Sequence, residues 1–333
     1  MKKNRSFLFI LALMIMLPIQ EAYSVSSGVP TIALRSNAIF QGTQGVNGVA
    51  SFYANWREEG GAPDYCTLTL VGSNPVVQYT GNNFAQCNFV DVPKGHYQLK
   101  LWKSSQVTDS SIVNVGDVIV MAGQSNNVSG LQPVDYIVPR PSSLGKVYVS
   151  DYSGQGSYQI LDAADVSTDF LQTAGVAHVA AGIAMNLPYP VAFINISQGN
   201  TTVLQWANGL ASRITYAVHE FRSPIVYWLQ GESDAVAGTS KADYQTTLTA
   251  MVTSLATDWS GKWLISLDGA GSSAVRIAQD AVVTFNSNCE YGIDADGFTR
   301  GTPSDPTNLE FVGSNITALG SAMGANIMAS GIL

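Results

Sequence analysis

The sequence predicts an α/β protein in which a doubly wound, mostly parallel sheet lies between two layers of helices, preceded by a small antiparallel β-sandwich. Two observations carry this prediction. Between residues 29 and 113, short stretches of alternating apolar and polar residues are separated by Gly, Asn and Pro clusters, a pattern typical of antiparallel strands. From residue 117 onward, continuous apolar runs alternate with amphipathic helical patterns, which is typical of buried parallel strands joined by helices.

The first element is a predicted signal peptide over residues 1–24. Cations within the first five residues precede an apolar run from Phe7 to Pro18, and small residues follow, as in a secretory leader. This run is shorter than the roughly 20 residues that cross a bilayer. No later segment is apolar for long enough either, so we expect no membrane span after signal removal. The mature protein is expected to be secreted or periplasmic.

The second element is the predicted β-sandwich domain, over residues 25–114. An exported protein can form disulfides, and Cys66 and Cys87 lie in segments that resemble neighbouring strands, so we expect them to pair. The remaining Cys289 is expected either to be buried as a small apolar side chain or to be exposed and reactive. The predicted strands with the clearest alternation cover residues 50–56, 66–70 and 96–102.

The third element is the predicted α/β domain, over residues 115–333. Two apolar stripes with helical spacing lie within it, in residues 176–187 and 244–255. Because these stripes alternate with the apolar runs, they predict helices that cover a parallel sheet. The apolar runs that predict its strands cover residues 118–121, 147–149, 191–196, 225–229 and 263–267.

Composition excludes several functions. The chain has 333 residues, 46% of them hydrophobic, which is typical of a folded protein and not of a disordered one. It carries a net charge of −8 with only 16 Lys and Arg residues, so nucleic-acid binding, which depends on clustered cations, is not expected. Its three cysteines and three histidines are dispersed and lack the spacing of metal ligands. We expect neither a metal nor another cofactor.

Polar residues follow three of the predicted strands, and in a doubly wound sheet ligands bind at those carboxyl ends. Ser125 lies in a small-residue turn that should begin a helix, which suits a nucleophile whose own N–H can stabilise an oxyanion. Gly199 and Asn200 follow a second strand, and Gln230 and Glu232 follow a third. Ordinary turns are the alternative explanation, because these residue types favour turns.

Together, these segments resemble a known family. The run from Val115 to Asn126, which contains Gly-Gln-Ser-Asn, resembles the sialate O-acetylesterase-like branch of the SGNH hydrolases. Residues 227–235, with Gln-Gly-Glu-Ser-Asp, resemble its second hallmark, and Gly199-Asn200-Thr201 is similar to its Gly-Gly-Thr turn. The resemblance covers roughly residues 112 to 330 and implies a three-layer, flavodoxin-like SGNH fold.

The resemblance also implies roles for these residues. Ser125 would attack an acetyl carbonyl on a sugar, so the expected partner is an acetylated carbohydrate or glycan, such as sialic acid or a polysaccharide. The N–H groups of Ser125 and Gly199 and the side chain of Gln230 would form the oxyanion hole. Glu232 and Asp234 would brace the site. For Glu232 the alternative is a carboxylate that satisfies free N–H groups where a helix begins.

The sequence departs from the family at the catalytic base. The family has a histidine near the C-terminus, in a pattern like Asp-x-x-His, but no histidine follows His219 here. Matching that spacing puts Asn308 at the base position with Asp305 to orient it, whereas counting back from Leu319-Gly320 puts Glu310 there. Asparagine cannot accept the proton. Glu310 can serve if burial raises its pKa.

The chain's own histidines are not expected to replace the missing base. His219 precedes the strand at residues 225–229 and should lie at the opposite end of the sheet. His178 is off the apolar stripe of its helix, and His96 belongs to the β-domain. We expect each of them to be solvated or structural.

Two functions are therefore predicted from the sequence. The first is a secreted carbohydrate O-acetylesterase with an altered base, and the second is a catalytically inactive relative that keeps the pocket to bind glycans. In either case Trp206 and Trp228 could stack on sugars, with burial in the core as the alternative.

Overall fold

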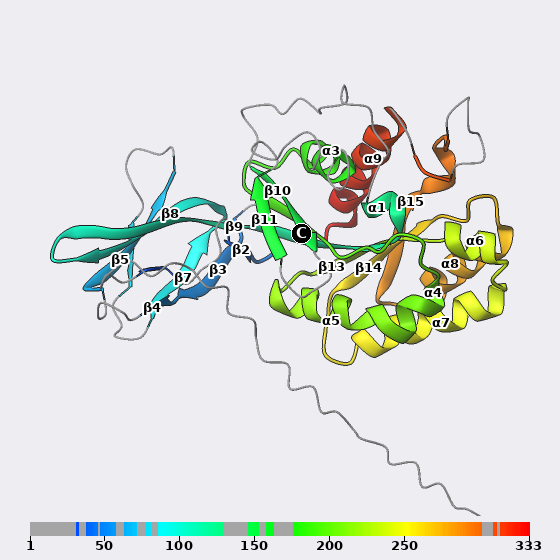
Figure 1. Ribbon diagram of the computed structural model, residues 1–333, viewed down its shortest axis with the longest axis horizontal. Coiled ribbons are helices and arrows are strands. Elements are labelled where there is room, and N and C mark those ends of the chain that lie inside the picture. The colour runs from blue at the N-terminus through cyan, green and yellow to red at the C-terminus, as the bar shows by residue number, and fades with distance from the viewer. Residues whose placement is uncertain are drawn as a thin grey trace, which may run out of the picture.

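The computed structural model has a central sheet with helices on both faces, joined to a smaller β-rich part by one long strand (Figure 1). This arrangement confirms the predicted α/β fold with a mostly parallel sheet. The predicted signal peptide, residues 1–24, lies outside the described residues. The structure describes residues 31–32, 38–45, 47–57, 63–71, 78–81, 86–128, 146–152, 158–162, 176–301, 309–311 and 314–333.

The central sheet is parallel except at one edge, where β11 pairs antiparallel with β10. All five strands predicted from apolar runs are present. The additional strands β11 and β15 were not predicted, because their residues mix polar and apolar types without a continuous apolar run. The spatial order is β11 (Tyr158–Asp162), β10 (Val147–Tyr152), β12 (Val191–Asn195), β9 (Gln106–Gly123), β13 (Ile225–Leu229), β14 (Lys262–Leu267) and β15 (Cys289–Asp294).

Helices cover both faces of this sheet (Figure 1). Helices α3 (Val176–Met185) and α9 (Ser314–Ser330) lie on one face, and α5 (Ala211–Glu220), α7 (Lys241–Leu255) and α8 (Ser273–Phe285) lie on the other. The predicted helical stripes correspond to α3 and α7. Shorter helices follow the strand ends, namely α1 (Ser125–Val128), α4 (Val203–Gln205), the π-helix η2 (Trp206–Leu210), α6 (Glu232–Ala237) and the 3₁₀-helix η3 (Ala295–Gly297).

Alternation along β9 divides the core of this part into two layers. Val118 and Val120 point into one apolar cluster, whereas Ile119 and Met121 point into another on the opposite face of the sheet. All four side chains are fully buried. A strand that buries both faces must be apolar throughout, which is why the sequence shows a run without alternation here.

Two of the sheets in the smaller part share an apolar core, in which Phe52 and Phe89 pack near Leu68 and Leu99. The strands of this part are antiparallel, as predicted, except that β2 runs parallel to β9. One sheet contains β2 (Ala38–Gln41), the first half of β9, β8 (Gly95–Lys103), β5 (Tyr65–Leu70) and β6 (Gln78–Gly81), the other pairs β3 (Val49–Ala54) with β7 (Cys87–Pro93), and β1 (Thr31–Ile32) pairs with β4 (Trp56–Arg57).

Strand β9 runs through both parts of the protein, and the predicted domain boundary between residues 114 and 115 falls inside it. That boundary stays a prediction. Just beyond it, Lys94 of the smaller part forms an ion pair with Asp117 of β9, with both side chains 0% exposed. Asp117 also accepts a hydrogen bond from Gln41 Nε2 at 3.3 Å. The long strand and the buried ion pair therefore connect the two parts.

Replacing Lys94 with methionine is expected to lower the free energy of unfolding by about 3–5 kcal/mol, because the buried Asp117 carboxylate loses its counter-charge. Urea denaturation measures this loss. The matched control is the double variant Lys94→Met/Asp117→Leu, which should recover most of it, since neither charge then remains buried. A single variant that is as stable as the wild type would contradict this expectation.

The predicted disulfide between Cys66 and Cys87 is present. We expected the two strands of this disulfide to be neighbours in one sheet. Instead, β5 and β7 belong to two different sheets of the smaller part. The bond therefore links these sheets across their shared core. The third cysteine, Cys289, is buried, and burial raises the pKa of its thiol to about 12. Of the two fates predicted for Cys289, the structure shows the buried one.

Removing the disulfide in the double variant Cys66→Ala/Cys87→Ala is expected to lower the free energy of unfolding by about 3 kcal/mol, the usual scale for a loop of this length. The sequence separation of the two cysteines is 21 residues. Chemical denaturation with and without reductant checks it: reductant should destabilise the wild type by a similar amount and leave the variant unchanged. An equal effect on both proteins would contradict the prediction.

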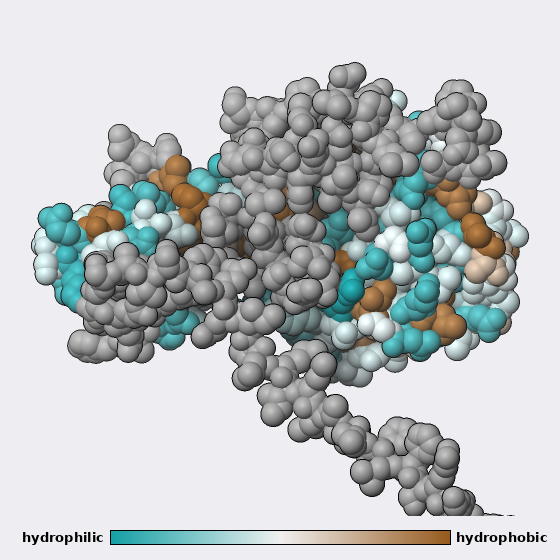
Figure 2. Space-filling model, viewed as in Figure 1, coloured by the Kyte–Doolittle hydropathy of each residue, from teal (hydrophilic) through white to brown (hydrophobic). Residues whose placement is uncertain are grey.

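Exposed apolar side chains are scattered over the surface. On the face shown in Figure 2, they form small patches interrupted by hydrophilic and intermediate residues. Within the described residues, no helix is both long enough and apolar enough to cross a membrane.

Candidate active site

Three adjacent strands carry the predicted site residues at their carboxyl ends. Strand β9 comes first in the chain and lies between the later strands β12 and β13, so the sheet order reverses there. Such a reversal leaves a crevice that binds ligands in open α/β sheets. Backbone hydrogen bonds fix the three ends together, because Gln124 N donates to Leu229 O at 3.1 Å and Gln198 N donates to Gly123 O at 3.0 Å. The structure therefore brings Ser125, Gly199 and Gln230 to one edge of the sheet.

The turn that presents Ser125 depends on Gly123. This residue has a φ of +146°, and a Cβ added to it would overlap the carbonyl oxygen of Leu229. Only glycine fits that conformation and that space. Helix α1 then begins at Ser125, as predicted, and its side chain stays partly exposed.

Gly199 lies directly beside Ser125. A Cβ added to Gly199 would lie 3.8 Å from the Cβ of Ser125. The next residue, Asn200, is exposed and has a φ of +55°, in the left-handed region that asparagine tolerates better than most residues. The turn after β12 therefore places the backbone of Gly199 within reach of a group bound at Ser125.

Glu310 also meets Ser125. The Ser125 hydroxyl lies close enough to the Glu310 carboxylate to act on its pKa as a hydrogen-bond donor. Burial raises the pKa of Glu310, the Ser125 hydrogen bond lowers it, Glu232 raises it and Arg300 lowers it, and the net result lies above the usual value. This is one of the two residues predicted for the base position. The other, Asn308, and its predicted orienter Asp305 lie outside the described residues.

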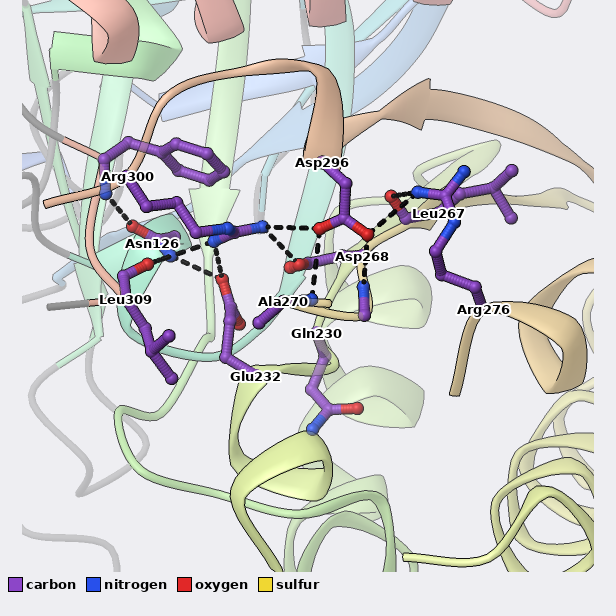
Figure 3. Close-up of polar contacts among 12 residues, drawn as sticks. Asn126, Gln230, Glu232, Leu267, Asp268, Ala270, Arg276, Asp296, Arg300 and Leu309 are labelled. Carbon is purple, nitrogen blue, oxygen red and sulfur yellow. Dashed lines mark hydrogen bonds and ion pairs between the residues drawn. The ribbon is translucent and has the colours of Figure 1, made fainter. Parts of the chain in front are cut away.

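Arg300 lies at the centre of a largely buried cluster of charged side chains (Figure 3). Arg300 Nη1 donates to Glu232 Oε1 at 2.6 Å, and Nη2 donates to Asp268 Oδ1 at 2.5 Å and to Asp296 Oδ1 at 3.2 Å. The Arg300 side chain is only 12% exposed. Burial lowers the pKa of this guanidinium, but the surrounding carboxylates raise it by a larger amount. The pKa therefore lies above its usual value, and the group stays charged.

Two of these carboxylates, Glu232 and Asp268, lie against each other. Burial, followed by the charge of Glu232, holds the pKa of Asp268 well above its usual range, while Arg300 lowers it. Glu232 is the first residue of α6, but its Oε1 accepts from Asn126 Nδ2 and Arg300 Nη1. The predicted alternative, a carboxylate that satisfies free N–H groups where the helix begins, is thus not what these two contacts show.

Gln230 is fully buried, and its carboxamide points away from the Arg300 cluster (Figure 3). Its Nε2 donates to Thr201 O at 3.0 Å and to Asp234 Oδ2 at 2.5 Å. Asp234 also accepts from the N–H of Val203 at 2.9 Å, which fixes the start of α4. These contacts connect the turn after β12 to α6. An oxyanion contact from Gln230, which the sequence predicts, would require one of its present donor contacts to break.

The three histidines lie elsewhere in the fold. His178 is buried in α3 and stacks on Phe193 with 5.7 Å between ring centroids, so it is structural rather than solvated. His96 Nδ1 lies 2.7 Å from Asn114 Oδ1, and His219 Nε2 lies 3.3 Å from Asp258 Oδ2. The side chains of Trp206 and Trp228 are 0% exposed and pack edge to face, so they belong to the core and do not stack on a sugar.

Sequence reasoning missed the role of Arg300 and of Asn126, which both contact the segment around Glu310. Asn126 lies inside the Gly-Gln-Ser-Asn motif, so its position beside the serine was the available signal. Arg300 has no such signal, because its partners come from α6, η3 and the segment after β14. Among the described residues, no group of three or more His, Cys, Asp or Glu side chains could hold a metal ion.

Comparison with known proteins adds independent evidence. A family model described as "Carbohydrate esterase, sialic acid-specific acetylesterase" matches residues 115–300, more than half of the chain. The match includes Ser125, Gly199, Gln230 and Glu232 and stops before Glu310. No curated protein matches the chain.

Solved structures share the fold. A carbohydrate acetylesterase from Xanthomonas citri is 16% identical with a TM-score of 0.56, over 89% of this chain and 74% of that one. A protein from Arabidopsis thaliana is 19% identical with a TM-score of 0.47, over 64% of this chain and 98% of that one. At these identities the first similarity supports the fold only, and the second adds nothing further.

Proposed function

Because this chain belongs to the sialic acid-specific acetylesterase family of carbohydrate esterases, we propose that it is a secreted serine esterase that removes acetyl groups from sugars such as sialic acid or from polysaccharides. The observation that carries the proposal is the proximity of the Ser125 hydroxyl, at the carboxyl end of β9, to the Glu310 carboxylate, whose pKa it lowers. It pairs a candidate nucleophile with a candidate base where family members need both.

In the proposed first step, Ser125 Oγ attacks the carbonyl carbon of the acetyl ester while its proton passes to the Glu310 carboxylate. The bond between that carbon and the sugar oxygen then breaks, and Glu310 returns the proton to the departing oxygen. The acetyl group is left on Ser125. A raised pKa suits Glu310 to this exchange, because a base works best when its pKa approaches the working pH.

The second step releases acetate. A water molecule gives its proton to Glu310 as it attacks the acetyl carbon, and the Ser125 oxygen leaves and recovers the proton. In both steps the proposed donors to the negatively charged carbonyl oxygen are the N–H groups of Ser125 and Gly199, two residues that lie next to each other. Each such donor lowers the barrier by roughly 2.7–4 kcal/mol. Gln230 remains the third proposed donor, and Asn200 a proposed substrate contact.

Secretion belongs to the same proposal. The predicted signal peptide and the Cys66–Cys87 disulfide both favour an oxidising compartment outside the cytoplasm. A secreted or periplasmic location would also give the protein access to acetylated glycans.

Acetate release is the direct test of the proposed function. The protein is produced from the whole chain and secreted by its host. It is then incubated separately with p-nitrophenyl acetate, O-acetylated sialic acid and an acetylated polysaccharide, and the released acetate is measured. We expect turnover by the wild type that depends on Ser125. If neither the wild type nor Ser125→Ala releases acetate, the proposal is contradicted.

The second candidate function is glycan binding without catalysis. It is favoured by one observation, the absence of a histidine from the chain after His219, where the family has its base. Binding to a glycan array without acetate release would support it. Acetate release that disappears in Ser125→Ala would exclude it.

A further inference from the structure

The segment that carries Glu310 is held on both sides by Asn126. Asn126 Nδ2 donates to the carbonyl oxygen of Leu309 at 3.1 Å, and Asn126 Oδ1 accepts from the N–H of Phe311 at 2.8 Å. One carboxamide therefore forms hydrogen bonds with both peptide groups that flank Glu310. Because Asn126 follows Ser125 directly in the chain, these two contacts also set the spacing between the serine and Glu310.

Arg300 holds the same segment from another direction. Its Nη1 donates to the carbonyl oxygen of Leu309 at 3.0 Å, and its guanidinium lies over the ring of Phe311, 4.1 Å from the centroid. The adjacent Gly301 N–H donates to the carbonyl oxygen of Glu310 at 2.9 Å. The segment that carries Glu310 is therefore fixed through its backbone and through the neighbouring Phe311 ring.

Glu232 contacts the side chains of both Asn126 and Arg300. Its Oε1 accepts from Asn126 Nδ2 and from Arg300 Nη1, and the Glu232 side chain is 2% exposed. The other end of the guanidinium reaches Asp268, which is fully buried, and Asp296. These carboxylates lie on α6, directly after β14 and on η3, and Figure 3 shows them around Arg300.

We propose that Arg300 and Asn126 are positioning residues that hold Glu310 against the Ser125 hydroxyl, and that Glu232 fixes both of them in place. This inference rests on the proposed function, because it assigns their role relative to the proposed nucleophile and base. Misplacing a catalytic group by about 1 Å can lower a rate by about 100-fold. When the contacts that hold the Glu310 segment are removed, we expect a loss of that size in kcat with little change in KM.

Charge gives the proposal a readout that packing alone does not provide. Burial and three neighbouring groups act on the Glu310 carboxyl: burial and the charge of Glu232 raise its pKa, and the Ser125 hydroxyl and Arg300 lower it. Arg300 itself also faces Asp268 and Asp296. Arg300→Gln should therefore raise the pKa of Glu310, and Glu232→Gln should lower it, although both variants break the same ion pair.

The experiment measures kcat, KM, melting temperature and the acid limb of kcat/KM in the full secreted chain. In Arg300→Gln we expect kcat to fall by about 100-fold and the acid limb to move to higher pH. In Glu232→Gln we expect a similar fall and an acid limb at lower pH. The matched control is Arg276→Gln, since the partners of this arginine are Leu267, Asp294 and Asp296. It should leave kcat and the acid limb unchanged.

Arg300→Lys keeps the experiment decisive if Arg300→Gln does not fold. Lysine retains the positive charge but not the two-pronged contact, so the acid limb should stay in place while kcat falls. If wild type is active, but Arg300→Gln and Arg300→Lys match Arg276→Gln in kcat and acid limb, the positioning role is wrong and the proposed function stands. If the wild type releases no acetate, both the proposed function and this inference fail.

Discussion

Ser125→Ala is expected to lower kcat for acetate release by roughly 10³-fold or more, because no other group in the proposed reaction can form the acetyl intermediate. The variant loses the hydroxyl that lies close to Glu310 but keeps the N–H groups at the turn. Substrate binding should therefore survive, and KM or a measured Kd should change little. Steady-state kinetics with an acetylated sugar, together with the burst of product in the first turnover, checks this result.

A serine in the neighbouring turn provides the matched control for Ser125→Ala. Ser197 follows β12 and donates its hydroxyl to the carbonyl oxygen of Met121 at 3.3 Å. Ser197→Ala removes a hydroxyl of the same kind from the same edge of the sheet, and it should leave kcat within a few-fold of the wild type. Trapping of an acetylated peptide that contains Ser125 in the wild type would identify the nucleophile directly. An acetylated peptide elsewhere would assign the reaction to another residue.

The parts of the site that lie close together in the chain could be predicted from the sequence. Ser125, Gly199 and Gln230 each follow an apolar run within a few residues, so a strand end and a turn fix their positions locally. The sheet order then brings them together, because β12, β9 and β13 are neighbours. Fold class and these strand ends needed only short-range patterns and the general rule for parallel sheets.

Long-range contacts could not be predicted in the same way. The sequence left Glu310 and Asn308 as alternatives, because matching the Asp-x-x-His spacing and counting back from Leu319-Gly320 give different registers. Arg300 took no predicted role, since its importance arises only when α6, β14 and η3 converge on it. The burial of Trp206 and Trp228 likewise depends on how their elements pack together, although strand and motif positions had left sugar stacking open.

Glu310→Gln is expected to lower kcat by about 10²–10⁴-fold, the usual contribution of a general base. Glutamine has nearly the same shape and can still accept a hydrogen bond from Ser125, but it cannot take up the proton. In the wild type the rate should fall with decreasing pH as Glu310 becomes protonated, and this acid limb should lie above the ordinary glutamate pKa of about 4.3, since burial raises the pKa of Glu310. The variant should lack this limb.

Stability should move in the opposite direction from activity. A carboxyl group whose pKa is raised on folding stabilises the folded state below its unfolded pKa, and that contribution is lost as the pH rises through the folded pKa. At pH 7 to 8 the wild type therefore carries the unfavourable burial of a charged Glu310, and Glu310→Gln does not. Its melting temperature should be equal to or above that of the wild type there, which separates lost chemistry from misfolding.

Two further variants accompany Glu310→Gln: one is a matched control, and the other tests the alternative base position. Glu290→Gln removes a partly exposed carboxylate on β15, 4.0 Å from Lys262, and should leave the rate and its acid limb unchanged. Asp305→Asn tests the register in which Asn308 occupies the base position. If Asp305→Asn removes activity while Glu310→Gln retains it, the base lies in that other register. If Glu310→Gln alone removes both the activity and the acid limb, a carboxylate replaces the family's histidine, and a serine esterase can work with a glutamate whose pKa is set by burial and by one buried arginine.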